Sequence, residues 1–217
     1  MNYRTDFYPE DLTDADTAID YNTNFGIGQT FYNKQKSVLD SVILWLDKTG
    51  APEGNINVKV YATTGTYGTD GLPTGDALAT SDNFDVTGIA GGGAATNTIT
   101  FSGDNRITLE ANTHYVFVFS ALNTWTVLKC VEVATDSTTL AHQGNSVFQE
   151  SDGGDWVADD TFDLIFYVMV DSIEEPRPSV YSGSSLSSGK TIKRKLTRPL
   201  DISKESHRWK RKQIKSR

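Results

Sequence analysis

The stretch from Ser41 to Ala62 constrains the fold more strongly than any other part of the sequence. Residues 41–46 form a run that is apolar on both faces, as in a central strand of a sandwich. Residues 50–55 are rich in Gly, Pro and Asn, which favour turns. In residues 56–62 apolar side chains alternate with others, so one face of this second strand is buried. The stretch predicts a β-hairpin whose buried face must be covered by further strands.

The rest of the sequence supplies those strands as short runs between turns. The clearest are residues 25–32, 96–101, 114–121, 125–134 and 162–170. One face of the first run carries Phe25, Ile27, Gln29 and Phe31. In total we expect roughly ten strands, spaced roughly 8–15 residues apart, and no helix in the body of the chain. This pattern predicts an all-β fold, an antiparallel jelly-roll-like β-sandwich with an extended basic C-terminal arm.

Charge divides the chain into two unlike parts. Of its 20 Lys and Arg and 28 Asp and Glu residues, 13 basic and two acidic ones lie in residues 176–217, a net charge of +11. Residues 1–175 keep the other 7 basic and 26 acidic residues, a net charge of −19. We therefore predict an acidic N-terminal arm or loop over residues 1–24, a β-sandwich domain over 25–175, and a Ser/Gly linker with a basic anchoring tail over 176–217.

Carboxylates suggest two weak sites of ion binding or catalysis. The acidic residues before position 24 lack the spacing of an EF-hand calcium loop. A second group, between residues 152 and 163, contains the weak calcium candidates Asp152, Asp155 and Asp159. A glycosidase would need a defined pair of carboxylates, and no feature of the sequence selects one. We therefore expect a solvated loop, no metal, no cofactor and no enzymatic activity.

The remaining candidate residues occur singly. Cys130, the one cysteine, cannot form an internal disulfide and is expected to be a small core residue. The three histidines lie far apart in the sequence without metal-ligand companions, so we expect His114 and His142 to be ordinary residues at strand ends. Tyr67, Trp125 and Trp156 are candidates for stacking on sugar rings, although aromatic residues in sandwiches more often fill the core or plug turns.

Six short segments together form a pattern that resembles a known family. They are residues 28–31, 41–46, 58–62, 72–79, 109–115 and 154–156. The most specific is Leu72-Pro73-Thr74-Gly75-Asp76-Ala77-Leu78-Ala79. Over about residues 25–170 the chain resembles the choice-of-anchor-type β-sandwich module of bacterial surface proteins and phage structural proteins. The resemblance implies a jelly-roll-like sandwich used for display, adhesion or virion building, and it implies no catalytic residues.

Targeting signals bear on which of these contexts applies. The first eleven residues lack a basic start, an apolar stretch and a small-residue cleavage site. No apolar run approaches the roughly 20 residues that a membrane helix needs. Members on bacterial surfaces would carry a signal and a sorting tail, and we find neither in this sequence. We therefore expect a phage protein that is made in the host cytoplasm, resides in the virion and has no membrane partner.

The basic tail has three interpretations. Its charged and apolar residues are candidates for docking on a protein scaffold: Lys193, Arg194, Lys195, Leu196, Arg198, Leu200, Arg208, Trp209, Lys210, Arg211, Lys212 and Ile214. The apolar residues at intervals favour a protein groove, because phosphate neutralisation by itself needs no Leu or Trp. Binding to nucleic acid is the second interpretation, and a solvated tail without a partner is the third.

The combined pattern predicts a virion structural protein, namely a minor capsid, decoration or fibre/tail-attached protein. Its basic arm would dock on a capsid or tail scaffold while the sandwich is displayed. Its partners would be other virion proteins, in a homo-oligomeric or multi-copy assembly. The alternative is a carbohydrate-binding adhesion module that attaches to host glycans through Tyr67, Trp125 and Trp156.

Overall fold

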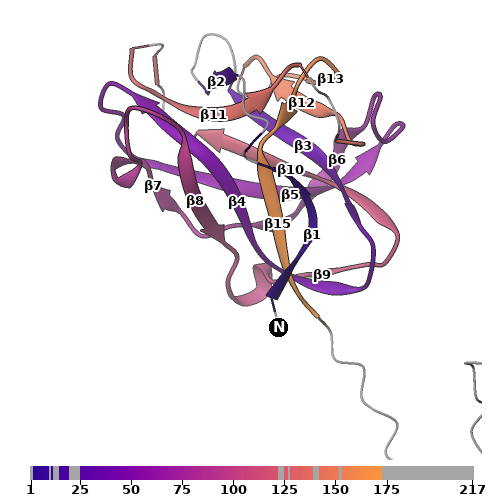
Figure 1. The fold of residues 1–217 in the computed structure, drawn as a ribbon. Coiled ribbons are helices and arrows are strands. Elements are labelled where there is room, and N and C mark those ends of the chain that lie inside the picture. Colours follow the sequence, from indigo (N-terminus) through magenta and orange to yellow (C-terminus); the bar gives the residue numbers. More distant parts are fainter. Residues whose placement is uncertain are drawn as a thin grey trace, which may run out of the picture. The chain divides into compact units, whose positions relative to one another are not determined.

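The protein folds into an antiparallel, jelly-roll-like β-sandwich, as the sequence predicts (Figure 1). The computed structural model describes residues 2–9, 11, 15–19, 25–121, 125–126, 128–138, 142–151 and 153–172. These residues contain fifteen strands in two sheets, together with the short 3₁₀ turns η2 (Val86–Gly88) and η3 (Gly103–Asn105). The basic arm of the predicted fold, residues 176–217, lies outside the described residues.

The first sheet has eight strands, and its main path runs β1-β15-β4-β11-β14. Strand β2 also pairs with β11, and β8 and β9 pair with β4. The bounds are β1 (Asn2–Tyr8), β2 (Ala15–Ile19), β4 (Ser37–Thr49), β8 (Ala95–Thr100), β9 (Thr108–Leu109), β11 (Cys130–Asp136), β14 (Asp163–Leu164) and β15 (Phe166–Ser172). The long strand β4 is central, as its apolar run predicts.

The second sheet has seven strands in the order β13-β12-β3-β10-β5-β6, with β7 pairing to β5. The bounds are β3 (Gly26–Asn33), β5 (Asn55–Thr64), β6 (Leu72–Thr80), β7 (Phe84–Asp85), β10 (Thr113–Ala121), β12 (Ser146–Gln149) and β13 (Trp156–Asp159). Its central strand β10 pairs antiparallel with both β3 and β5.

The predicted hairpin over residues 41–62 is wrong, because its two strands belong to opposite sheets. Strand β4 lies in the first sheet and β5 in the second, so residues 50–54 carry the chain across the sandwich. Likewise β10 lies in the second sheet and β11 in the first. Alternation in a sequence reports that one face of a strand is buried, but it does not identify the neighbouring strand. Repeated crossing between the sheets gives the fold its jelly-roll character.

The N-terminal segment is also corrected. We predict an arm or loop over residues 1–24, but β1 pairs with β15 and β2 pairs with β11, so both strands extend the first sheet. Residues 2–8 contain Tyr, Thr and Phe, which favour strands, and Thr5 and Tyr8 are buried. The acidic composition of the whole segment concealed this local preference.

Apolar side chains of both sheets form the main core. Its largest fully buried members include Phe31, Phe117, Phe119 and Phe166, and the predicted core residue Cys130 is fully buried there. A smaller cluster of Val116, Val118 and Val147 lies on the opposite face of the second sheet. In alternation along β10, Val116 and Val118 point away from the main core, which Phe117 and Phe119 enter.

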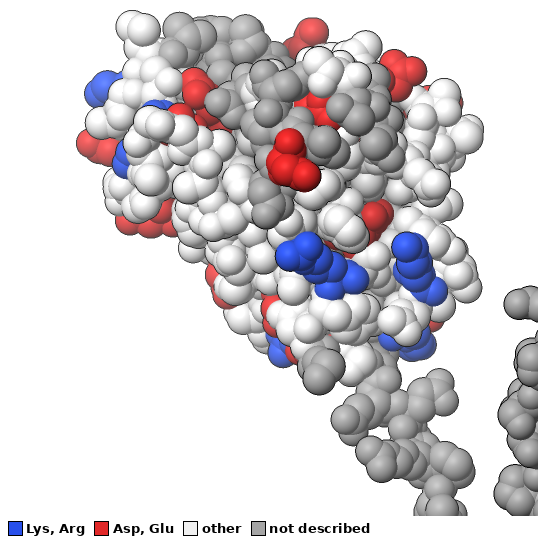
Figure 2. All heavy atoms as spheres, in the orientation of Figure 1, with Lys and Arg blue, Asp and Glu red and all other residues white. Residues whose placement is uncertain are grey.

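Apart from the buried Asp136 and Asp163, the charged side chains of the described residues lie outside this core. On the face that Figure 2 shows, acidic side chains are spread over the sandwich and basic side chains lie between them in small separate groups. Within the part of the chain that the structure describes, no helix has the length and apolar character to cross a membrane.

Candidate functional site

The most developed polar site is a hollow of about 440 Å³ at one side of the sandwich. We call it the Asp6 hollow, and it is lined by Asp6, Phe7, Tyr8, Pro9, Tyr32, Lys34, Tyr67, His142 and Gln143. Strand β1 and the residue after it contribute one wall, and the end of β3 with two loops contributes the others. Its size falls in the ordinary range of small-molecule sites, about 300–1,000 Å³.

Asp6 is held in place by groups from three segments. Its Oδ1 accepts a hydrogen bond from the backbone N–H of Phe7 at 2.9 Å, and its Oδ2 accepts one from the N–H of Tyr32 at 2.7 Å. The charge of Asp6 also acts on the nearby Tyr67 hydroxyl, whose pKa it raises. These contacts fix the carboxylate at the junction between β1, β3 and the loop that carries Tyr67.

His142 presents an N–H group beside this carboxylate. Its Nδ1 accepts a hydrogen bond from the backbone N–H of Gly144 at 3.1 Å, which places the proton of the neutral ring on Nε2. Nε2 lies 3.4 Å from Asp6 Oδ1 and has no hydrogen-bond partner among the described residues. The His142 side chain is only 5% exposed, so this is a buried and unsatisfied donor on the wall of the hollow.

Gln29 connects His142 to the buried Asp163. The Gln29 Nε2 donates to Asp163 Oδ1 at 2.8 Å and lies 3.2 Å from His142 Nδ1, while its Oε1 accepts from the Leu164 N–H at 3.1 Å. Burial raises the pKa of Asp163, and the hydrogen bond from Gln29 partly opposes that rise. The network therefore ties β3 to β14 behind the hollow.

A second buried carboxylate anchors β1 from the inside. Asp136 is fully buried, and its Oδ2 accepts a hydrogen bond from the Tyr8 hydroxyl at 2.6 Å. Its Oδ1 accepts from the Thr138 backbone N–H at 2.8 Å and from the Thr138 hydroxyl at 3.0 Å. Both carboxylates of the interior are therefore hydrogen-bonded, as buried charges require.

Aromatic rings form another wall. The ring of Tyr67 stacks on His114 with centroids 4.1 Å apart and planes 6° apart, and His114 in turn lies 5.0 Å from Tyr32. Burial raises the pKa of Tyr67 strongly, and the charge of Asp6 raises it further. Tyr67 thus stays a neutral phenol beside Asp6.

The sequence did not predict this site. We expected His142 to be an ordinary strand-end residue, and Asp6 lay within the predicted acidic arm. One signal was present: Gln29 shares a face with Ile27 and Phe31, which are core residues. A long polar side chain among core positions requires buried partners, and these partners are His142 and Asp163.

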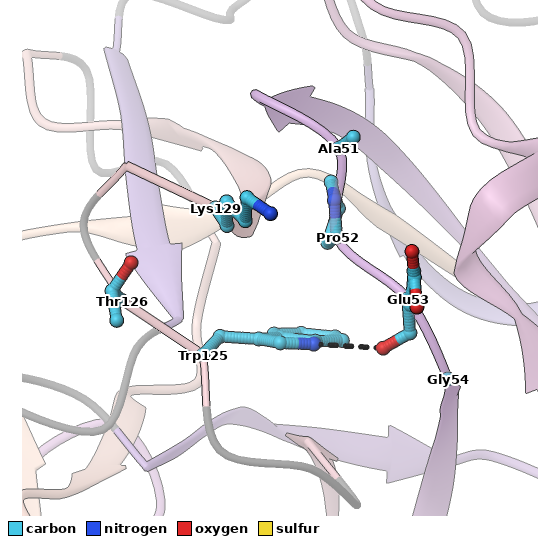
Figure 3. Close-up of a pocket in the computed structure, with 7 residues that line it drawn as sticks. All are labelled: Ala51, Pro52, Glu53, Gly54, Trp125, Thr126 and Lys129. Atoms are coloured by element: carbon cyan, nitrogen blue, oxygen red, sulfur yellow. Dashed lines mark hydrogen bonds between the residues drawn. The ribbon is translucent and has the colours of Figure 1, made fainter.

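A second hollow, of about 470 Å³, lies where the chain crosses between the sheets (Figure 3). Its lining combines residues 51–54 with Trp125, Thr126 and Lys129. Trp125 is buried, and its indole Nε1 donates to the Glu53 carbonyl at 3.0 Å, so the ring joins the two crossing segments. Trp125 is therefore a turn plug in this structure, which is the more common role of such aromatic residues.

The three predicted glycan contacts do not form one surface. Trp156 packs with the small valine cluster, and its ring lies over Gly26 at the start of β3. Tyr67 stacks on His114, which contacts Tyr32 near the other end of β3. Six residues of strand separate Gly26 from Tyr32, a distance of about 20 Å. Trp125 belongs to the main core between the sheets. Of the three, only Tyr67 lines the Asp6 hollow.

The weak calcium candidates are not gathered by the part of the sandwich that is described. Asp159 Oδ1 accepts from the backbone N–H and hydroxyl of Thr161, which stabilises its own turn. Asp152 lies outside the described residues. Within those residues, no group of three or more His, Cys, Asp or Glu side chains is arranged to hold a metal ion. The predicted docking residues between 193 and 214 also lie outside the described part of the chain.

Comparison with known proteins gives little further guidance. No protein-family model matches the sequence, and no curated protein matches it. Among solved structures, the chain is similar to a surface layer associated protein of Clostridium difficile, solved as its cysteine protease and lectin-like domains, with a TM-score of 0.41 and 11% identity. The match covers 68% of this chain and 32% of that protein's chain, so the chain spans about a third of its length. The fold described above rests on the strand pairing of this chain alone.

Proposed function

We propose that the protein is a non-enzymatic virion structural protein that displays its sandwich and attaches through its basic C-terminal tail. The observation that carries this proposal is the reversal of charge at the end of the sandwich. The compact unit that contains all described strands ends at Glu175, and the net charge changes from −19 before that point to +11 after it. The basic tail is suited to bind an acidic partner, whereas the acidic sandwich is suited to be displayed away from that partner.

The composition of the tail favours a protein scaffold as that partner. Apolar side chains recur among its charges, at Ile192, Leu196, Leu200, Trp209 and Ile214. Large apolar and aromatic anchors between charges are typical of a chain that lies in a protein groove. The negative body also opposes close approach to nucleic acid, which favours a capsid or tail subunit over the genome.

A multi-copy assembly follows from the same features. Fully extended, residues 176–217 span about 140 Å, enough to contact several neighbouring subunits. A segment that folds on binding can bury a large area along such a path without a large rigid interface. The resemblance to sandwich modules of phage structural proteins supports the particle context, as a minor capsid, decoration or fibre/tail-attached protein.

Truncation after Glu175 tests the proposal. We expect the truncated protein to fold and to be absent from purified particles, while the full chain is incorporated, as measured by mass spectrometry of particle proteins. Full incorporation of the truncated protein would show that the tail is not the attachment segment.

Two sets of substitutions then separate the partners. Replacing Leu196, Leu200 and Trp209 by Ser keeps every charge of the tail, whereas replacing Lys193, Arg194 and Lys195 by Glu reverses part of it. A protein groove requires that both sets reduce incorporation. Loss with the charge variant alone, together with a steep salt dependence of DNA binding, would assign the tail to nucleic acid instead.

A further inference from the structure

The Asp6 hollow has walls that are fixed by the fold itself. Asn145, almost fully buried, links the loop of residues 65–71 to the loop of residues 142–145 by accepting from the Gly71 N–H at 3.2 Å and donating to the Gly71 carbonyl at 3.0 Å. Its backbone N–H also donates to the Thr30 hydroxyl at 2.7 Å. A side chain at Gly68 would start 2.2 Å from the Gln143 carbonyl, so the two loops are in direct contact. A ligand would meet a preformed site.

Three polar side chains line these walls, and two of them, Lys34 and Gln143, are exposed to a ligand. The buried Nε2–H of His142 has no hydrogen-bond partner among the described residues. Lys34 is exposed at the rim and forms no ion pair with any described residue, and the exposed Gln143 contributes its amide. These groups lie in the same lining as the Asp6 carboxylate and the rings of Tyr32 and Tyr67.

We propose that the Asp6 hollow binds an uncharged saccharide. A pyranose ring has apolar C–H faces that pack on aromatic rings, and hydroxyl groups that both donate and accept hydrogen bonds. The lining offers tyrosine rings for the faces, exposed donors on Lys34 and Gln143, and an acceptor on Asp6. This proposal does not depend on whether the protein is attached to a particle.

The charges of the site and of the body select this ligand class. Lys34 and Asp6 place both signs of charge in the lining of the hollow, which suits a hydroxylated ligand better than an apolar one. Residues 1–175 carry a net charge of −19, which repels acidic saccharides at long range. The ligand is therefore a neutral sugar, and it is recognised by Tyr67 rather than by Trp125 or Trp156.

Binding of the full-length protein to immobilised oligosaccharides tests the proposal. The panel contains neutral oligomers of glucose, galactose, mannose and N-acetylglucosamine, together with polygalacturonate as an acidic polymer. We expect binding to at least one neutral oligomer and weaker binding to polygalacturonate, followed by titration calorimetry of the best ligand. Failure to bind any neutral oligomer, or a preference for polygalacturonate, would overturn the proposal.

Matched variants locate the site. Lys34→Ala removes an ammonium group at the hollow, and Lys36→Ala removes one two residues away that pairs with Glu110 at 2.9 Å. We expect the first to weaken binding by about tenfold, as for loss of a hydrogen bond to a charged group, and the second to leave binding unchanged. Equal effects of the two variants would contradict a site in the hollow.

The aromatic wall provides a second, independent pair of variants. Tyr67→Ala removes the stacking surface and should weaken binding by about three- to tenfold, whereas Tyr67→Phe keeps the ring and should bind nearly as well as the native protein. The melting temperature of each variant shows whether it is folded. If Tyr67→Ala does not fold, the difference in saccharide binding between Lys34→Ala and Lys36→Ala still tests whether the site is in the hollow. Unchanged binding in both Lys34→Ala and a folded Tyr67→Ala would refute the assignment.

Discussion

Single polar residues inside the sandwich decide how its N-terminal strand is attached. Gln29 is fully buried and bonds to both Asp163 and Leu164, while His142 lies beside it with one ring nitrogen satisfied and the other facing Asp6. Buried polar groups of this kind destabilise a fold when their partners are lost, because the remaining partner stays desolvated. The stability of the protein should therefore respond to pH and to small changes at these positions.

Asp163 gives a pH dependence of known sign. Its folded-state pKa is raised by burial above the ordinary value of about 3.9. The stability it contributes is thus complete below about pH 4 and is lost as pH rises through the folded-state pKa. Urea unfolding between pH 4 and 8 should show the unfolding free energy of the native protein falling relative to that of Asp163→Asn. Parallel curves for the two proteins would contradict this.

Gly28 permits the close approach of β3 to β10. A Cβ atom at this position would lie 2.1 Å from the Phe117 carbonyl oxygen, which is backbone and cannot move aside cheaply. We expect Gly28→Ala to lower the unfolding free energy by about 3 kcal/mol, the upper end of overpacking costs. Gly88→Ala is the control, since a Cβ there meets nothing within 4 Å. Equal chemical denaturation midpoints for both variants would exclude this account.

One buried side chain of the second sheet holds several strands of the first sheet together at one end of the sandwich. Asn33 is fully buried: its Oδ1 accepts from the hydroxyls of Thr5 and Ser37, and its Nδ2 donates to three carbonyls, including that of Leu109. One amide at the end of β3 therefore joins β1, β4 and the two-residue strand β9. Such a residue specifies which strands meet at this end of the sandwich.

Replacement of Asn33 should loosen these strands together. In Asn33→Ala the buried hydroxyls and carbonyls lose their partners, and we expect the unfolding free energy to fall by at least about 2 kcal/mol. Hydrogen exchange should show lower protection in β1 and β9 than in β10. Asn97→Ala, which removes one local bond to the Ala95 carbonyl, should change stability by less than about 0.5 kcal/mol. If protection from hydrogen exchange fell only in β3, Asn33 would not be an anchor shared by these strands.

The molecule as a whole combines a folded acidic body with a basic tail, and their charges partly cancel. The full chain has a net charge of −8, whereas residues 1–175 have −19. The last described strand, β15, ends at Ser172, three residues before the acidic part of the chain ends.

Removal of residues 176–217 should change charge without changing the fold. We expect the truncated protein to elute from an anion exchanger at clearly higher salt than the full chain, because its negative charge is more than doubled. Its melting temperature should agree with that of the full chain within about 2 °C, which corresponds to less than 1 kcal/mol for a domain of this size. A much lower melting temperature would mean that the tail supports the sandwich.

Local chemistry of the chain was enough to predict the fold class, the central position of residues 41–46 and the burial of Cys130, because alternation and apolar runs report burial directly. It also predicted the charge division, which is a property of composition. The pairing of strands could not be predicted in this way. Residues 41–62 predicted a hairpin, yet β4 and β5 lie in opposite sheets, because a strand with one buried face can pair with many different neighbours. The Asp6 hollow likewise required the folded chain, because Asp6, Tyr67 and His142 come from segments more than 60 residues apart and meet only when β1 pairs with β15.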